Sequence, residues 1–367
     1  MNILQTEASP NFGGQEYEMV LEAKELAKRG HFVILIINSK NKILAEIIKQ
    51  FKLNFYQLPF KNTIDLFSII KMRKIIKKHN IEIIHSHSPK DHWISYWATL
   101  NSNIPILRWR DIINPVPSKW HRSFIYKRGC KYLLVRCNMI KEMFIKNNKI
   151  NPKKIKVIPA SIDFEKFNPN INGNYIRSEF NIPLNATIIA LIAQIRPEKG
   201  HKYFIEAANY LKDRPNIYFL IVGGETDKSS IRINELKDLV NKFGLKNIIF
   251  TGFRKDIPQI MSTIDILVLP STDVESVGRV ILEAFAMKKP VIATSIGGIP
   301  EFVLNKKTGI LIPPHNSKAI AEAIDFILNN PLKTKEMIEN AYDFVKRNFS
   351  VETIVDKIEK IQNDALK

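Results

Sequence analysis

Cysteine and long apolar runs are scarce in this chain of 367 residues. Only Cys130 and Cys137 occur, and neither belongs to a Cys-x-x-Cys pair or a Cys/His cluster. This argues against a disulfide framework or a zinc site and fits a reducing cytoplasm. No apolar run reaches the roughly 18 residues that a membrane span needs. The start, MNILQTEASP, lacks the basic and apolar regions of a secretory signal, so we expect a cytoplasmic protein.

Acidic residues are also scarce, but only in the first half. Residues 1–170 carry 29 Lys and Arg against 13 Asp and Glu, a net charge of +16 out of +19 for the chain. Residues 171–367 carry 26 against 23, a net +3. A basic surface suits nucleic acid, an anionic membrane or a phosphorylated acceptor. A general drift toward Lys, Ile and Asn is the alternative, but such a drift would load both halves alike.

The sequence is rich in β-branched runs that alternate with amphipathic stretches, which is typical of parallel α/β architecture. One series occupies residues 1–168, with an irregular middle at 88–153, and a second occupies 175–349. The chain is also longer than one hydrophobic core usually supports. We predict two Rossmann-like domains facing a cleft, in which ligands bind beyond the carboxyl ends of the strands. A last helix in 350–367, capped by Ser350, is expected to return to the first domain.

Two glutamates stand eight positions apart in PSTDVESVGRVILEAFAMKKPVIATSIGGIPE, residues 270–301. A strand is expected to end at Pro270, Glu275 lies in the following loop, and Glu283 lies about two turns into the next helix. A carboxylate can accept two hydroxyl hydrogen bonds, which suits a sugar or a ribose. Exposed N–H groups at the helix start and at the Gly297–Gly298 turn favour phosphate oxygens.

This segment resembles the E-x7-E motif of retaining glycosyltransferases of family 4, also called glycosyl transferases group 1, which have the GT-B fold. The resemblance covers essentially the whole chain. It implies that Glu275 lies by the donor sugar and that Glu283 binds the ribose hydroxyls. The backbone at the helix start, Ser276, Val277 and Gly278, is implied to contact the donor.

A second match is AQIRPEKGH, residues 193–201, where the family usually has Gly-Arg-Leu-x-x-x-Lys-Gly. In the family, the Arg and Lys of this motif neutralise the donor diphosphate, so no metal ion is needed to balance the charge of the leaving group. Lys199 falls in register, but Gln194 replaces the usual Arg. We expect Arg196 to substitute, because it would face the same side if the strand continued that far.

Two further segments match the family's donor site. NFGGQEYEMVLEAKELAKRGH, residues 11–31, places Gly13 and Gly14 before a helix, where the backbone can approach a phosphate closely. NIIFTGFRKDIPQIM, residues 247–261, resembles the nucleobase segment, in which the backbone near Phe253 and Arg254 meets the base.

Three histidines, His85, His87 and His92, gather near one expected strand end. Their spacing fits no common zinc pattern. The family resemblance implies that His87 contacts the donor sugar or the acceptor, and we expect His85 to be a packed strand residue. Asp91 and His92 are candidates for hydrogen bonds to the acceptor.

Two basic segments contribute strongly to the charge of the first half. Residues 66–80 interleave Ile, Leu and Phe with five cations, and residues 118–132 mix Trp120, Phe124 and Tyr126 with Lys and Arg. One interpretation is amphipathic packing with solvated outer faces. The other is peripheral association with an anionic membrane, at the inner face of the cytoplasmic membrane.

The predicted function is transfer of a sugar from a UDP- or GDP-sugar to a glycan or lipid-linked acceptor, with retention and without a metal or other cofactor. Lipopolysaccharide, capsule or another surface glycan is the expected product. The alternatives are another GT-B sugar-nucleotide enzyme (an epimerase or phosphorylase), an inactive sugar-nucleotide-binding relative, and a basic nucleic-acid-binding protein. The sequence shows no recognisable nucleic-acid-binding motif, so we expect no nucleic-acid partner.

Overall fold

The computed structural model describes residues 1–111, 113, 120–225, 231–273 and 275–367, without the side chains of residues 120–122, 231 and 232. The chain divides into two compact units, Met1–Ser161 with Val351–Lys367, and Ile162–Ser350. The segment 162–168 therefore belongs to the second unit, whereas the sequence had suggested the end of the first domain there. The side chain of Trp120, an expected aromatic anchor, lies outside the described residues.

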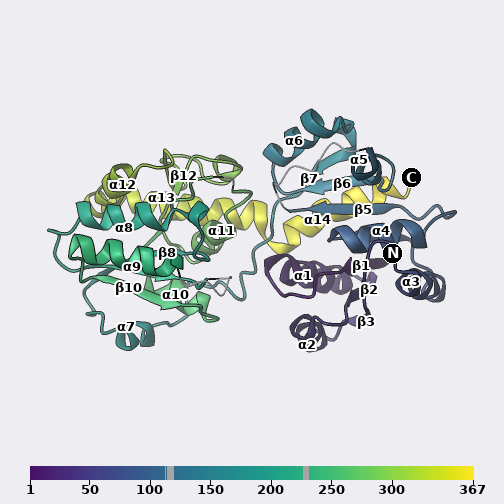
Figure 1. The fold of residues 1–367 in the computed structure, drawn as a ribbon, viewed down its shortest axis with the longest axis horizontal. Coiled ribbons are helices and arrows are strands. Elements are labelled where there is room, and N and C mark those ends of the chain that lie inside the picture. The colour runs from purple at the N-terminus through teal and green to yellow at the C-terminus, as the bar shows by residue number, and fades with distance from the viewer. Residues whose placement is uncertain (112, 114–119, 226–230, 274) are drawn as a thin grey trace. The chain divides into compact units, whose positions relative to one another are not determined.

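The first unit is built on a parallel seven-stranded sheet in the order β3-β2-β1-β4-β5-β6-β7 (Figure 1). The strands are β1 Asn2–Glu7, β2 Phe32–Asn38, β3 Asn54–Leu58, β4 Ile83–Ser86, β5 Ile106–Arg110, β6 Tyr132–Val135 and β7 Ile155–Val157. The helices are α1 Gly14–Lys28, α2 Lys42–Gln50, α3 Leu66–Lys78, α4 Pro89–Ala98, α5 Trp120–Lys127, α6 Asn138–Asn148 and α14 Val351–Ala365, with the 3-10 turn η1 Pro152–Lys154.

Helices cover both faces of this sheet because its strands are apolar on both sides. On one face, α1, α2 and α14 pack over alternate strand residues such as Ile3 and Leu35. On the other face, α3 and α4 pack over Leu4 and Ile34. Ile354 of α14 is fully buried in the first of these cores, so the last helix is an integral part of the first unit.

The second unit has a parallel six-stranded sheet in the order β10-β9-β8-β11-β12-β13. Its strands are β8 Thr187–Ile192, β9 Ile217–Val222, β10 Ile248–Gly252, β11 Ile266–Leu269, β12 Val291–Thr294 and β13 Ile310–Ile312. Its helices are α7 Tyr175–Glu179, α8 His201–Tyr210, α9 Ile231–Phe243, α10 Ile257–Thr263, α11 Arg279–Ala286, α12 Ser317–Asn329 and α13 Pro331–Phe349, with the 3-10 turns η2 Pro197–Lys199 and η3 Ile299–Glu301. Helices α8, α9 and α12 share one core with the strands.

In each sheet the strand order reverses beside the first strand of the unit, β1 or β8. Ligands of open α/β sheets bind at the carboxyl ends of the strands near such a reversal. Both candidate regions follow those ends: the loops after β1 and β4 in the first unit, and those after β8 and β11 in the second. Among the described residues, no helix is both long and apolar enough to cross a membrane.

Candidate active site

In the second unit, a lysine and a glutamate from two neighbouring loops meet. Nζ of Lys199, at the end of η2, donates to Oε2 of Glu275 at 2.5 Å. Oγ of Ser271 donates to the same oxygen at 3.2 Å. The loops are also joined through their backbones, because the Thr272 amide donates to the Glu198 carbonyl at 2.9 Å. The structure thus brings together the two residues that the sequence predicted for donor sugar and diphosphate.

A glycine turn fixes the backbone of Glu275. Gly297 has φ +57°, and a Cβ there would lie 2.1 Å from the Glu275 carbonyl oxygen, so no other residue fits. The Gly298 amide donates to that carbonyl at 2.9 Å. The loop then enters α11 through Ser276, the buried Val277 and Gly278, which has φ +58°. Because Val277 is buried, only its backbone is placed to contact a ligand.

Glu283 lies on α11 near two cations. Arg279, one turn earlier, approaches it at 3.4 Å between Nε and Oε1. Burial raises the pKa of the Glu283 carboxyl, while Arg279 and Lys166 lower it. Burial likewise lowers the pKa of Lys166, against the attraction of Glu283. Lys166 is a neighbour that the sequence did not indicate, because it comes from the segment before α7.

The argument for Arg196 was wrong in one respect. It required β8 to continue to residue 196, but the strand ends at Ile192, and Arg196 precedes η2 in an extended conformation. The Arg196 guanidinium approaches Glu198 at 3.8 Å and is 43% exposed. It lines a cavity of about 290 Å³ together with His201, Tyr203 and Glu235, a cavity that Lys199 does not line. A role for Arg196 in donor binding therefore stays a prediction.

The predicted nucleobase segment has one side chain that is engaged within the protein, Arg254, and one that is exposed, Phe253. The Arg254 side chain is held by Glu179 and by Asp256, with Nη2 to Asp256 Oδ2 at 2.7 Å. Phe253 is 75% exposed. The Arg254 side chain is thus engaged within the protein, whereas the Phe253 side chain is open to solvent.

In the first unit, a buried carboxylate that the sequence analysis missed connects the two loops. Glu7 ends β1 and accepts hydrogen bonds from the Ser9 amide at 2.8 Å, from Gln15 Nε2 at 2.6 Å and from Ser88 Oγ. Gln15 Nε2 also donates to the His87 carbonyl at 3.2 Å. Burial, followed by repulsion from Asp91 and Glu16, raises the pKa of Glu7 to about 8 despite the hydrogen bonds from Ser88 and Ser9. Only its position at a strand end could have signalled it.

Asp91 and His92 do not fit the predicted contact with an acceptor. Asp91 is fully buried and accepts from Thr6 Oγ1 at 2.7 Å and from the His87 amide at 2.9 Å. Burial raises the pKa of Asp91 to about 6, although the nearby Arg108 lowers it. His92 is 1% exposed, with Nδ1 at 2.9 Å from Ser86 Oγ. Both side chains hold the β4–α4 turn in place.

His87 is different. Its ring is 4% exposed, and neither nitrogen has a hydrogen-bond partner among the described residues. The ring stacks on Trp109 at 5.8 Å with an interplanar angle of 12°. Burial, and then His85, Arg136 and Arg108, hold the pKa of His87 well below its usual value, so the ring is neutral near pH 7. His85 is a fully buried strand residue, as predicted.

Arg136, which the sequence analysis also missed, supports this platform. Its guanidinium lies 4.3 Å from the centre of the Trp109 ring. Nε donates to Asp111 at 2.7 Å and Nη1 to Glu18 at 3.0 Å, so a buried cation links α1 with the ends of β5 and β6. The arrangement fixes Trp109, on which His87 stacks.

Gly13 and Gly14 stand at the start of α1. Gly13 has φ −157°, an extended conformation open to any residue, and a Cβ there would meet only the flexible Glu16 carboxylate at 3.3 Å. The backbone therefore does not require glycine at position 13. Within the described parts of the chain, no group of three or more His, Cys, Asp or Glu could hold a metal ion.

Two parallel α/β units, each with a charged cluster following the ends of its strands, are the architecture of the GT-B fold. The family model "Glycosyl transferases group 1" matches residues 174–344, and "Glycosyltransferase Family 4" matches residues 12–166. The chain is 30% identical, over 82% of its own length and 80% of the relative's, to the UDP-Gal:alpha-D-GlcNAc-diphosphoundecaprenol alpha-1,3-galactosyltransferase of Escherichia coli.

Solved structures of other proteins show the same fold. A glycosyltransferase from Rickettsia africae is 29% identical, with a TM-score of 0.88 over 100% of this chain and 99% of that one. Anabaena HepE in complex with UDP, at 22% identity and a TM-score of 0.87 over 99% and 100%, shares the fold. The chain belongs to the group 1 glycosyltransferases of family 4, and it is a transferase of the glycosyl class.

Proposed function

We propose that the protein transfers a sugar from a UDP- or GDP-sugar to a hydroxyl of a lipid-linked or other surface glycan. The observation that carries this is the Lys199–Glu275 pair, held between two loops that are joined through their backbones. The name of the 30% identical relative from E. coli specifies a UDP-sugar donor and a diphosphoundecaprenol-linked acceptor. A relative from Staphylococcus aureus, 24% identical over 94% of this chain, is a capsular polysaccharide biosynthesis glycosyltransferase.

In this reaction the leaving nucleoside diphosphate gains negative charge. Lys199 is the cation placed to offset it, aided by the N–H groups at the start of α11, so no metal is required for that charge. Glu275 then accepts hydroxyls of the donor sugar while it keeps Lys199 in position. Glu283 takes the two ribose hydroxyls.

We propose retention at the anomeric carbon through attack on the same face as the departing diphosphate. The leaving phosphate takes the proton of the acceptor hydroxyl, and the protein contributes position and charge. The neutral His87 ring, with two nitrogens that lack partners in the described structure, supplies a donor or an acceptor to a sugar hydroxyl. We place the reaction at the inner face of the cytoplasmic membrane, where the basic first unit meets an anionic surface.

A panel of UDP-, GDP- and ADP-sugars tests the donor through thermal stabilisation of the protein.

Glu283→Gln should weaken nucleotide binding by about 1.5–3 kcal/mol, because a charge-assisted acceptor is lost. Glu322→Gln, in the exposed Lys318–Glu322 pair on α12, is the matched control. Stabilisation by no nucleotide sugar, or wild-type affinity in folded Glu283→Gln, would contradict the assignment.

The chemical step has its own test. Nucleotide release should require an acceptor and should continue in EDTA, and the product should keep the donor's anomeric configuration. Loss of turnover in EDTA that magnesium restores would overturn the metal-free mechanism.

A further inference from the structure

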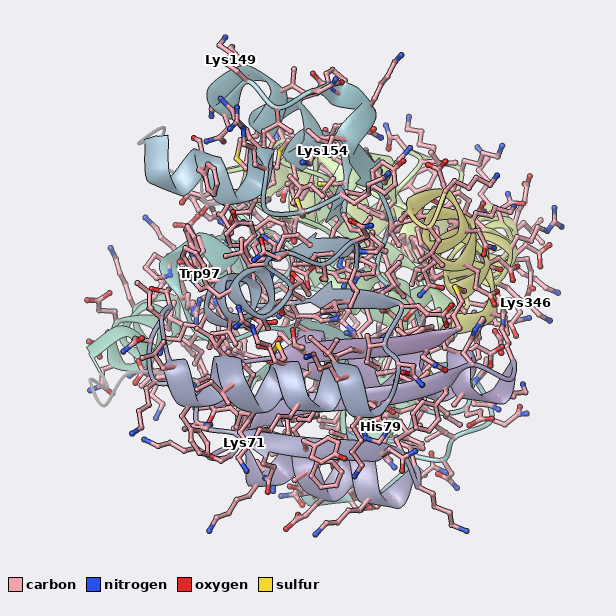
Figure 2. The ribbon with its side chains drawn as sticks, turned by 90° about the vertical axis from the view of Figure 1, so that its right-hand side faces the viewer. Lys71, His79, Trp97, Lys149, Lys154 and Lys346 are labelled. Atoms are coloured by element: carbon pink, nitrogen blue, oxygen red, sulfur yellow. The ribbon has the colours of Figure 1, made fainter. Side chains whose placement is uncertain are left out.

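The exposed cations of the first unit are spread over its surface. Residues 127–156 contain ten Lys and Arg and one acidic residue, Glu142. Helix α3 contains five cations and no acidic residue. Figure 2 shows Lys71 of α3 toward the bottom and Lys149 toward the top of the face turned to the viewer, so these two side chains do not converge on one ligand.

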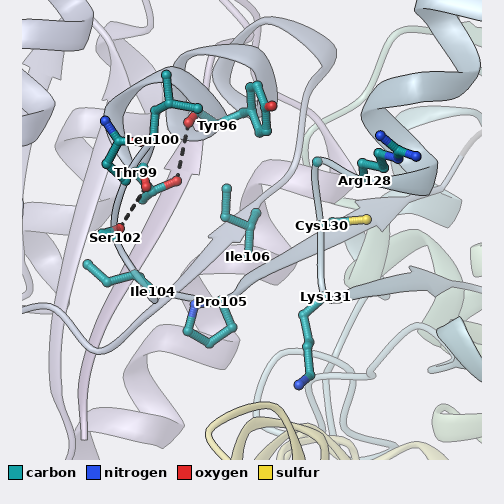
Figure 3. A pocket seen from close by; sticks show the side chains of 12 residues that line it. Tyr96, Thr99, Leu100, Ser102, Ile104, Pro105, Ile106, Arg128, Cys130 and Lys131 are labelled. Carbon is teal, nitrogen blue, oxygen red and sulfur yellow. Dashed lines mark hydrogen bonds between the residues drawn. The ribbon is translucent and has the colours of Figure 1, made fainter.

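A hollow of about 370 Å³ between the end of α4 and the start of β6 contains two cations, Arg128 and Lys131. Figure 3 shows these side chains at opposite ends of the hollow and pointing away from each other. They therefore do not present their charges to one anion. Buried polar groups on the opposite face of the sheet, beneath α14, are arranged differently, because they contact one another.

Three polar side chains lie in the apolar core beneath α14. Gln362 of α14, His85 of β4 and Gln5 of β1 are each fully buried. His85 and Gln5 are register partners, and each follows a strand residue of that core, Ile83 or Ile3, by two positions, so both face α14. A buried amide or imidazole that is not fully hydrogen-bonded costs stability relative to an apolar side chain of the same size. Core packing alone therefore does not explain these residues.

Gln362 and Trp109 contact opposite nitrogens of the His85 ring. Nε2 of Gln362 lies 3.0 Å from Nε2 of His85, and Nε1 of Trp109 lies 3.5 Å from Nδ1 of His85. Burial lowers the pKa of His85 to about 3, so the ring is neutral near pH 7 and carries one proton. An indole nitrogen can only donate a hydrogen bond, so Nδ1 of His85 accepts it and the proton lies on Nε2.

This position of the proton determines how the Gln362 amide must lie. A protonated Nε2 needs an acceptor, which is the amide oxygen, and a half-turn of the amide exchanges its oxygen and nitrogen with little change in shape. While the nitrogen faces His85, Oε1 of Gln362 has no hydrogen-bond partner among the described residues. The half-turn therefore satisfies both groups. The hydrogen bonds then run in one direction, from Trp109 to His85 and from His85 to Gln362.

This chain of hydrogen bonds ends at the ring that supports His87. The His87 and Trp109 rings are stacked with 5.8 Å between their centres, and the Arg136 guanidinium lies 4.3 Å from the centre of Trp109. Contacts with the face of a ring allow it to slide in its own plane, whereas a hydrogen bond at Nε1 fixes its edge. The edge of Trp109 is thus held, through His85, by the last helix.

We propose that Gln362 is a positioning residue for sugar transfer, which acts through His85 and Trp109 to hold the His87 ring toward the sugar. This inference rests on the proposed function, in which His87 forms a hydrogen bond with a sugar hydroxyl. It adds that the C-terminal helix contributes to the reaction as well as to the core. The chain of hydrogen bonds itself can be tested without any substrate.

Gln362→Met tests the chain, because it keeps the length of the side chain and removes the amide. The matched control is Ile358→Val, which trims an equally buried residue one turn earlier on the same face of α14. With ¹⁵N-labelled tryptophan, the four indole N–H groups of the protein give separate NMR signals. The Trp109 signal is the one lost in Trp109→Phe or, by elimination, the one kept when each of the other three is replaced by Phe.

The Trp109 signal should move in Gln362→Met and stay in place in Ile358→Val. An unmoved signal in Gln362→Met, or equal shifts in both variants, would show that hydrogen bonds do not link Gln362 to Trp109.

Kinetics test the positioning role. Gln362→Met should lower kcat about 10-fold, because His87 is less well placed. Its affinity for UDP or GDP, whichever the wild type binds, should not change. Gln362→Glu keeps an oxygen toward Nε2 of His85 and should retain most of the turnover, and Ile358→Val should stay near wild type. Wild-type kcat in folded Gln362→Met, or equal losses in the Met and Glu variants, would overturn the proposal.

The two readouts separate this proposal from the proposed function. A shifted Trp109 signal in a protein that transfers no sugar would confirm the hydrogen bonds but remove the reaction, and the positioning role with it. Sugar transfer by the wild type, with an unmoved Trp109 signal in Gln362→Met, would leave the proposed function standing and remove the chain of hydrogen bonds.

Discussion

Glu7 illustrates how one buried carboxyl can make a protein sensitive to pH. It accepts three hydrogen bonds and is nearly neutral below its raised pKa of about 8. Once ionised, it places a negative charge beside Asp91 and beneath the start of α1. A phosphate at that helix start would be repelled by this charge.

The raised pKa gives a prediction for stability. Between about pH 4.5 and pH 8 the folded protein holds a proton on Glu7 that the unfolded chain has released, so the free energy of unfolding should fall as the pH rises through this window. Asp91, with its pKa raised to about 6, adds a further decrease in the free energy of unfolding in the acidic part of this window. Glu7→Gln should flatten the dependence. Denaturant unfolding across the window measures it, with Glu46→Gln, at an exposed site on α2, as the control for a lost carboxylate.

An unchanged slope in Glu7→Gln would mean that Glu7 is ionised in the folded protein. In that case the three hydrogen bonds that Glu7 accepts lower its pKa by more than burial raises it.

At the scale of elements, the short η2 turn determines where Lys199 lies. Gly200 follows it at φ +72°, and a Cβ there would lie 1.8 Å from the Pro270 carbonyl oxygen. The loop after β8 is therefore pressed against the end of β11, and Lys199 meets Glu275 because of this contact.

Lys199→Gln should lower kcat by about 10²–10³-fold, because a fixed cation no longer faces the leaving diphosphate. Lys202→Gln, three residues on, removes the same charge from an exposed lysine that pairs with Glu206, and it should leave kcat near wild type. Steady-state kinetics at saturating donor compares the two. Equal losses would point to a general effect of charge rather than to a contact with the donor.

Strands and helices with a regular apolar pattern could be predicted from the sequence. A strand that contains a buried charged residue could not. The strands of the second unit and helices α2, α3 and α12 follow apolar periodicity. Strand β5 was missed because its sequence, ILRWR, carries two arginines, and Arg108 is nevertheless 1% exposed with Nη1 donating to the Ser86 carbonyl at 3.1 Å. The argument for Arg196 needed β8 to continue to residue 196, but an apolar run does not show that the strand ends at Ile192 and that the chain then turns into η2 at Pro197.

The candidate site divides in the same way. The resemblance to the family's motifs gave Lys199 and Glu275, which the structure joins. It could not give Glu7 or Arg136, because their roles come from partners far away in sequence, such as Ser88 for Glu7 and Glu18 for Arg136. Asp91 was a candidate for a contact with the acceptor, because polarity at a strand end does not reveal whether a side chain faces solvent or the turn itself.

At the scale of the whole molecule, the net charge of the first half was evident from the sequence, but its location was not. The structure places it on α3, which also carries the exposed Leu66, Phe67 and Ile70, and in residues 127–156.

The second unit begins and ends at one place. The Ile162 amide donates to the Phe349 carbonyl at 2.8 Å, and Ile162 bridges to Ser350. Ser161 and Val351 are each one residue beyond this bridge, so only a short gap separates the two parts of the first unit. The 189 residues from 162 to 350 are thus an insertion into the first unit.

This topology has a consequence for engineering and for synthesis on the ribosome. A chain in which a few glycines join residue 161 to residue 351 should fold cooperatively, since it retains α14 as well as residues 1–161. The fragment 1–161 should not, because it lacks Ile354, Val355 and Ile358, whose burial is worth about 1.5–3 kcal/mol each. Circular dichroism and urea titration would compare them, and equal stability would show that α14 is dispensable. If α14 is required, the first unit stays incomplete during translation until the inserted cassette has already been made.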